Sequence, residues 1–243
     1  MSTIAPAGRR IVYPESDGQP IAENTLQAEW IVRIHGNLQS QFRDRDDVFV
    51  AMDNLWYPVE GDPTIRTAPD VYVAFGRPKG HRGSYRQWEE GGIAPQVVFE
   101  ILSPGNRGGE MARKFRFYEH YGIDEYYIYD PDDNTLTGFR RTGNELQDIP
   151  KMDGWVSPLL GIRFDLSSEP ELVIWGRDGQ RFLTFLELSE LVIREQARAA
   201  NEGQRAEQER QRAEYERQRA DALAAKLRAA GIDLSSGPHA KLF

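Results

Sequence analysis

The 243-residue sequence contains no cysteine. This absence excludes disulfide bonds, thiolate zinc sites, iron–sulfur clusters and a cysteine nucleophile. The sequence also has no run of about 20 apolar residues, which a membrane-spanning helix requires, and residues 1–14 lack the apolar segment of a signal peptide. We therefore expect a soluble, cytoplasmic protein that makes no contact with a membrane.

The sequence also has fewer positive than negative charges. The chain has 30 Lys and Arg residues against 38 Asp and Glu residues, for a net charge of −8. Such a chain does not coat nucleic acid non-specifically, although a local basic surface can still contact it. Hydrophobic residues make up 40% of the chain, which is enough for a folded core and excludes wholesale disorder.

Three regions of the chain differ in composition. Residues 1–20 are rich in Pro, Gly and Ser, which predicts a loose or partly docked N-terminal arm. Residues 21–186 alternate helical and strand patterns and carry nearly all the aromatic side chains, which predicts the main domain. Residues 187–243 turn to Ala, Glu, Gln and Arg, which predicts a long C-terminal helix and a short tail.

The hydrophobic pattern of the main domain predicts an α/β fold, with a mixed sheet flanked by helices. We expect helices over residues 24–38 and 109–121, and strands over residues 48–52, 70–75, 96–102, 126–130 and 136–140. The last two strands are joined by a turn of hairpin type. Residues 76–95 show no clear period, which predicts a long loop.

The C-terminal helix carries a seven-residue repeat. Its first position holds Ala206, Ala213, Ala220 and Leu227, and the position three residues later holds Glu209, Glu216, Leu223 and Ala230. A two-stranded coiled coil needs apolar residues at both positions, so this helix is expected to dimerise weakly or to lie against a partner. Interspersed Glu and Arg are typical of a long solvated helix.

Two carboxylates stand at strands of the main domain. Glu100 interrupts an otherwise apolar strand, and Asp70 opens another. Taken singly, Glu100 is explained by a strand end that reaches water, and Asp70 by a turn that enters a strand. Taken together, two carboxylates at the ends of neighbouring strands can share one Mg²⁺ ion, which takes one or two protein carboxylates and keeps water and phosphate as its other ligands.

Lys114 is the third candidate, on the helix that follows Glu100. A lysine beside the buried Phe115 is usually a solvated side chain. That helix must nevertheless pack on the sheet that holds Asp70 and Glu100, so the ammonium group can reach the same cleft. Two acids, a lysine and Mg²⁺ provide what phosphodiester hydrolysis needs, namely a positioned acidified water and positive charge for the transition state.

A larger set of residues carries a family resemblance: residues 68–71, residues 98–107, Lys114, Tyr118, Gly122 and residues 125–131. Over about residues 20–165 the chain resembles the PD-(D/E)XK nuclease superfamily, and within it the cyanobacterial Uma-type restriction endonucleases. The resemblance implies a restriction-endonuclease-like fold and an Mg²⁺- or Mn²⁺-dependent DNA endonuclease. It also implies that Asp70 and Glu100 bind the metal, that Lys114 is the catalytic lysine, and that the C-terminal helix is an addition.

The chain departs from the superfamily pattern at one position. The lysine is expected two residues after the acid, where this chain has Leu102, so Lys114 from the following helix takes that role. The resemblance also implies an additional acid on the first helix, for which Glu29 is the first choice and Glu23 the second.

Basic residues in loops are the candidate DNA contacts: Arg77, Lys79, Arg82 and Arg86 in the long loop, and Arg107 in the turn after the Glu100 strand. Solvated loop charge is the alternative explanation for them. A second function also remains open, in which a non-catalytic nucleic-acid-binding or scaffold protein keeps the nuclease fold. In either case the C-terminal helix can assemble a homodimer.

Overall fold

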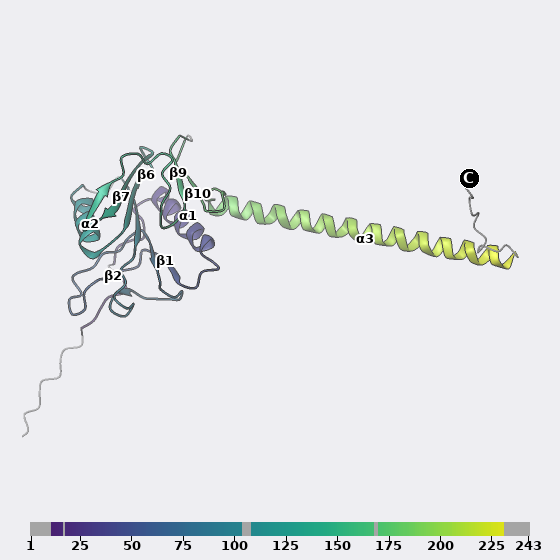
Figure 1. Cartoon of the computed structure of the whole chain (residues 1–243), viewed down its shortest axis with the longest axis horizontal. Helices are drawn as coiled ribbons and strands as arrows, with labels where there is room; N and C mark the ends of the chain where they lie inside the picture. Colours follow the sequence, from purple (N-terminus) through teal and green to yellow (C-terminus); the bar gives the residue numbers. More distant parts are fainter. Residues whose placement is uncertain (1–10, 17, 104–107, 168–169, 231–243) are drawn as a thin grey trace, which may run out of the picture. The chain divides into compact units, whose positions relative to one another are not determined.

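A computed structural model describes residues 11–16, 18–103, 108–167 and 170–230 of the chain. The chain divides after Phe185 into two compact units. A six-stranded mixed sheet lies at the centre of the first unit (Figure 1). Its strands are Val48–Met52 (β1), Val71–Phe75 (β3), Val97–Ile101 (β5), Glu125–Asp130 (β6), Thr135–Thr142 (β7) and Glu145–Asp148 (β8).

The strands lie side by side in the order β1-β3-β5-β6-β7-β8. Only β5 and β6 run parallel, and they are connected by the helix Gly108–Tyr121 (α2), which ends at Gly122 with a φ of +92°. Strands β3 and β5 are antiparallel, with Val71 opposite Phe99. The start of β3 therefore lies beside the end of β5, and this arrangement positions the site described below.

The two faces of the sheet are covered by different helices. Side chains at alternate positions of β5 point to opposite faces. Val97, Phe99 and Ile101 join the core that includes the helix Thr25–Gln41 (α1). Val98 joins the core on the other face, together with Tyr118 of α2. Because Glu100 follows Val98 by two residues, its side chain also lies on the face covered by α2.

Helix α1 begins at the cap that the sequence predicted. The Asn24 side chain accepts a hydrogen bond of 2.8 Å from the Gln27 backbone N–H. The helix runs to Gln41, three residues beyond the expected end, and it packs its buried residues Trp30, Ile31, Ile34 and Leu38 on the sheet. The predicted strands and helices are otherwise found within a few residues of their expected ends, and the α/β prediction is confirmed.

Two small sheets complete the first unit. Trp56–Tyr57 (β2) pairs in parallel with Tyr85–Arg86 (β4), and Arg163–Asp165 (β9) pairs antiparallel with Val173–Trp175 (β10). The prediction of a structureless loop over residues 76–95 is therefore wrong at β4. A strand of two residues is too short to show a period in the sequence.

The described part of the N-terminal arm contacts the first unit. The Tyr13 ring lies 5.2 Å from the Tyr57 ring and 4.9 Å from the Trp88 ring, measured between centroids. The Tyr57 hydroxyl donates a hydrogen bond of 2.7 Å to the Pro14 carbonyl. These contacts hold the arm to the small sheet of β2 and β4.

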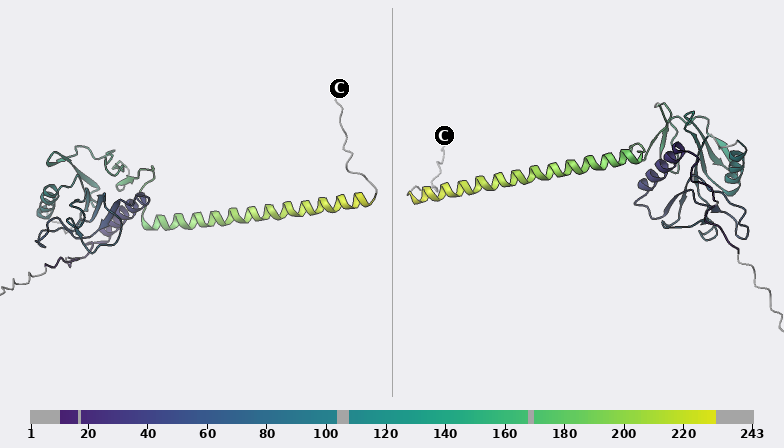
Figure 2. Two further views of the ribbon diagram at one scale, coloured as in Figure 1. Left: turned by 60° about the horizontal axis from the view of Figure 1, so that its bottom comes forward. Right: turned by 180° about the vertical axis from the view of Figure 1, so that it is seen from behind.

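The described part of the second unit belongs to one helix, Phe185–Ala229 (α3), whose first residue is the last of the first unit. Both views in Figure 2 show α3 as a continuous helix. None of its side chains is buried. Among the described residues, no helix combines the length and the apolar character needed to cross a membrane.

Candidate active site

The structure brings together the three residues that the sequence singled out. Asp70 immediately precedes β3, Glu100 lies on β5, and Lys114 lies on α2. The Lys114 Nζ and Glu100 Oε2 atoms form an ion pair of 2.7 Å. The Asp70 Oδ2 atom accepts a hydrogen bond of 2.6 Å from the Ile101 backbone N–H. The antiparallel pairing of β3 and β5 is thus the reason that Asp70 and Glu100 meet.

A cavity of about 470 Å³ lies at this point of the fold. Asp70 and Lys114 line it, whereas Glu100 is buried behind them with 2% of its side chain exposed. Other charged residues that line the cavity are Glu23, Asp53, Arg66 and Glu110. The cavity therefore offers a polar space next to a buried ion pair.

Both oxygens of the Glu100 carboxylate are bound by side chains of α2. Lys114 binds Oε2, and the Tyr118 hydroxyl, one helical turn further along, donates to Oε1. Burial raises the pKa of Glu100, while Lys114 and Tyr118 act in the opposite direction. Burial lowers the pKa of Lys114, but the Glu100 and Asp70 carboxylates outweigh this effect and raise it overall. Lys114 is therefore held as a cation.

Asp70 also lies in an unfavourable electrostatic environment. Burial, and then repulsion from Glu100, raise its pKa to about 8, although Lys114 and the Ile101 N–H oppose the shift. Asp53 adds a further, smaller repulsion. The site therefore holds more carboxylate charge than the one ammonium group of Lys114 balances.

This excess of carboxylate charge fits a divalent cation. Within the described ranges, no three His, Asp or Glu side chains form a group able to hold a metal ion by themselves. Mg²⁺ does not need such a group, because it takes one or two protein carboxylates and fills its other positions with water and substrate phosphate. A cation bound to Asp70 and Glu100 would oppose the rise in the pKa of Asp70.

Three further charged residues that line the cavity, Asp53, Arg66 and Glu110, were missed by sequence reasoning. Asp53 follows β1, and its backbone N–H donates to the carbonyls of Pro69 and Asp70, at 3.2 Å each. The pairing of Met52 with Val71 places Asp53 beside Asp70, and this register was not predicted. Arg66 also lines the cavity, and it lies in an irregular segment whose sequence carries no periodic signal.

The family model Uma2, described as "Putative restriction endonuclease", matches residues 4–169. The chain belongs to the Uma2 family. This confirms the resemblance that residues 68–131 indicated. Comparison with curated proteins gives no significant match.

Solved structures similar to this Uma2 chain include a crystal structure titled as that of a "putative nuclease belonging to DUF820" from Anabaena variabilis. The two chains are 18% identical, with a TM-score of 0.43. The match covers 55% of the Uma2 chain and 72% of the other chain.

The acid predicted on the first helix differs from the one found at the site. Glu29 is exposed on α1 and does not line the cavity, so the structure does not bring it to the other site residues. Glu23, the second choice, lines the cavity and accepts a hydrogen bond from the Ser103 hydroxyl. The difference arises because Glu23 precedes the helix cap, where the chain passes the end of β5, whereas Glu29 faces solvent.

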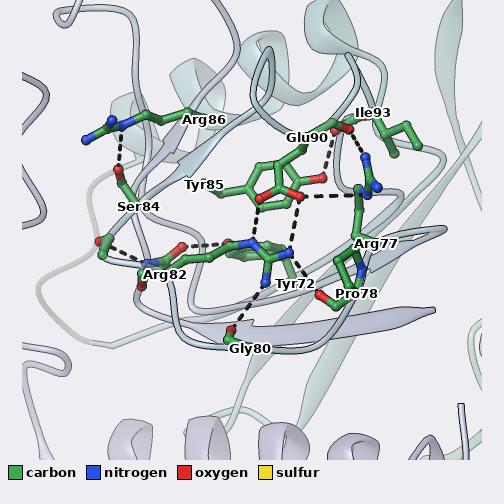
Figure 3. A network of polar contacts seen from close by, with 12 residues as sticks. Tyr72, Arg77, Pro78, Gly80, Arg82, Ser84, Tyr85, Arg86, Glu90 and Ile93 are labelled. Carbon is green, nitrogen blue, oxygen red and sulfur yellow. Dashed lines mark hydrogen bonds and ion pairs between the residues drawn. The ribbon is translucent and has the colours of Figure 1, made fainter. Parts of the chain in front are cut away.

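Two candidate DNA contacts of the long loop, Arg77 and Arg82, are paired with Glu90 within the first unit (Figure 3). Arg82 binds both carboxylate oxygens of Glu90, one of them at 3.1 Å from Nη2, and its guanidinium lies 4.0 Å from the centre of the Phe49 ring. Arg77 lies 3.7 Å from the same carboxylate and donates to the Glu90 carbonyl. Arg82 and Glu90 are each only 13% exposed.

The other three candidate DNA contacts are Arg86, Lys79 and Arg107. The Arg86 guanidinium pairs with Glu89 at 3.3 Å and lies 5.3 Å from the Tyr13 ring centre. The Lys79 Nζ atom donates to the Arg43 carbonyl at 2.6 Å on an exposed part of the loop. Arg107 lies outside the described residues.

Proposed function

We propose that this Uma2 protein is a divalent-cation-dependent endonuclease that hydrolyses phosphodiester bonds in DNA. The observation that carries the proposal is the Lys114–Glu100 ion pair beside Asp70 at a polar cavity. Family membership supports the nuclease activity. A scaffold protein has no need for a buried carboxylate whose pKa is raised to about 8, because such a group destabilises the fold at neutral pH.

In the proposed reaction, water attacks the phosphorus atom of the scissile phosphodiester. A bond forms between the water oxygen and phosphorus, and the bond between phosphorus and the leaving nucleotide oxygen breaks. The attacking water releases a proton to the solvent, and the leaving oxygen takes one up from it. Lys114 is held as an ammonium ion, so its role is to donate hydrogen bonds to the attacking water or to the phosphate oxygens rather than to remove a proton.

The acidic residues of the site have a separate role. Asp70 and Glu100 are the residues that would hold Mg²⁺ or Mn²⁺, which when bound supplies an acidified water and positive charge for the transition state. Tyr118 and Lys114 fix the orientation of the Glu100 carboxylate. Arg66 lines the same cavity and is the further cation suited to a DNA phosphate.

Cleavage of supercoiled plasmid DNA tests the proposal directly. The wild-type protein is expected to nick the plasmid with Mg²⁺ or Mn²⁺ and not with EDTA. Glu100→Gln and Lys114→Met each remove one side of the ion pair and are expected to lower the rate at least about 100-fold. Glu29→Gln is the matched control, because Glu29 is exposed on α1 away from the cavity.

Two outcomes would contradict this assignment. Equal nicking by wild type and Glu100→Gln would identify a contaminating nuclease and favour the non-catalytic role. Cleavage of single-stranded RNA in preference to plasmid DNA, lost in the same variants, would keep the site but change the substrate.

A further inference from the structure

Helix α3 carries exposed apolar side chains near its two ends. Phe185 is 72% exposed, Val192 54% and Leu223 58%. Leu188, three residues after Phe185, is also exposed. A solvated helix gains nothing from large apolar side chains at such positions, so this surface is suited to a partner.

The seven-residue repeat extends over the whole helix. Its first position is occupied in turn by Phe185, Val192, Ala199, Ala206, Ala213, Ala220 and Leu227. The position three residues later is occupied by Leu188, Glu195, Glu202, Glu209, Glu216, Leu223 and Ala230. The seam is therefore apolar at each end, with alanine at the first position and glutamate at the second through the middle.

A parallel pair of α3 helices is disfavoured by this pattern. In a parallel coiled coil each seam residue meets the same residue of its partner. Glu195, Glu202, Glu209 and Glu216 would then form successive layers of facing carboxylates. Like charges brought together in a partly desolvated seam repel one another.

An antiparallel pair removes every one of these contacts. Reversing one helix brings the first position of one chain opposite the second position of the other. A single alignment then gives the layers Phe185–Ala230, Leu188–Leu227, Val192–Leu223, Glu195–Ala220, Ala199–Glu216, Glu202–Ala213 and Ala206–Glu209. The large apolar residues meet each other at both ends, and every glutamate faces an alanine.

Arginines complete the complementarity. Each alanine of the middle seam directly follows an arginine, in the pairs Arg198-Ala199, Arg205-Ala206, Arg212-Ala213 and Arg219-Ala220. A seam glutamate of one helix therefore faces an alanine of the partner helix, and an arginine of the partner lies next to that alanine. Within one helix, Arg198 already turns toward the seam, since its Nε atom lies 3.0 Å from Glu202.

We infer that α3 pairs with α3 of a second copy of this chain in an antiparallel coiled coil, in the alignment given above. Self-complementarity is the argument for this partner. A surface that binds another protein, or the first unit of its own chain, has no reason to match its own reversed sequence in every layer.

Engineered disulfides test the direction of the pair, and the absence of natural cysteine makes the result unambiguous. The full-length variants Leu188→Cys and Leu227→Cys are prepared separately and oxidised alone and as a mixture. The antiparallel pair predicts a covalent dimer only in the mixture, because residues 188 of the two chains would lie about 58 Å apart along the helix pair. A disulfide in Leu188→Cys alone would show a parallel pair and overturn the inference.

Light scattering tests the pair independently. The wild-type chain is expected to be a dimer at micromolar concentration. Val192→Asp places a charge opposite Leu223 and is expected to give a monomer. Ala197→Asp is the matched control, because it adds the same charge to the same part of the helix. Ala197 lies five residues after Val192, which places it on the outer side of the helix pair. This variant is expected to remain dimeric. A monomeric wild type, or a dimer that Val192→Asp leaves intact, would overturn the inference.

Discussion

At the scale of single residues, the Glu100 carboxylate depends on one turn of α2, because Lys114 and Tyr118 bind its two oxygens. Tyr118→Phe removes one donor from a buried carboxylate, which is expected to destabilise the protein by about 1–3 kcal/mol. Since the Tyr118 hydrogen bond lowers the pKa of Glu100, its loss is expected to shift the acidic limb of the cleavage pH profile upward. Urea unfolding and pH–rate profiles measure the two effects.

Tyr126 provides the control for this variant. It is fully buried, and its ring lies 4.9 Å from that of Tyr118, but its hydroxyl has no hydrogen-bond partner among the described residues. Tyr126→Phe is expected to be neutral or stabilising, because no bond is lost and an unpaired polar group is removed. If both variants lost the same free energy of unfolding, packing of the hydroxyl groups would explain the loss rather than the contact with Glu100.

Asp70 makes the stability of the cation-free protein depend on pH. Its pKa is 3.8 in an ordinary environment and about 8 in the folded protein, so between these values the folded state holds a proton that the unfolded state has released. The free energy of unfolding is therefore expected to fall as the pH rises from 4 to 8. In EDTA at pH 8, Asp70→Asn is expected to be more stable than wild type by about 2 kcal/mol or more.

Urea unfolding of both proteins at pH 5 and pH 8 measures this difference. At pH 5 the two proteins are expected to differ much less, because Asp70 is then largely protonated when folded. A difference that stays constant between the two pH values would contradict the raised pKa.

At the scale of elements, the Glu90 carboxylate joins two arginines of residues 76–95 and is only 13% exposed (Figure 3). Glu90→Gln leaves Arg82 and Arg77 without their anion, and is expected to destabilise the protein by about 2–3 kcal/mol. Glu89→Gln is the matched control on the same loop, because the Glu89–Arg86 pair is at the surface and is worth less than about 1 kcal/mol. Chemical denaturation of both variants checks the prediction.

The elements show where sequence reasoning succeeds. Strands such as β5 and helices such as α1 were predicted because a long apolar pattern determines their type. The pairing of β2 with β4 was not predictable, since each has two residues and the bonds join positions far apart in the chain. The pairing of Arg77 and Arg82 with Glu90 was not predictable either. It depends on a turn, and a turn has no periodic signal in the sequence.

At the scale of the whole molecule, cation binding and folding are expected to be coupled. Mg²⁺ that binds only the folded protein raises its stability in proportion to the logarithm of the ion concentration. Wild type and Glu29→Gln are expected to show a rising melting temperature with Mg²⁺ at pH 8, and Asp70→Asn to show little change. An equal rise in all three proteins, measured by thermal denaturation, would place the cation elsewhere.

The site as a whole could be predicted in part. Asp70, Glu100 and Lys114 stood out because charged groups in or beside apolar segments need a partner. Asp53 and Arg66 did not, because each lies in an irregular segment. They reach the cavity only through the pairing of β1 with β3 and the path of the chain before Asp70. Register and chain path are properties of the folded sheet that one sequence does not reveal.

The hydrogen bond from the Ile101 N–H to Asp70 gives the site a spectroscopic consequence. The acceptor is a titratable carboxylate rather than a backbone carbonyl, so the protection of this single amide follows the charge state of the site. Exchange of the Ile101 amide with deuterium is therefore expected to slow when Asp70 is ionised, whereas its neighbours in the β5 ladder keep their rates. One backbone proton thus reports on the charge of the Asp70 carboxylate without any substrate present.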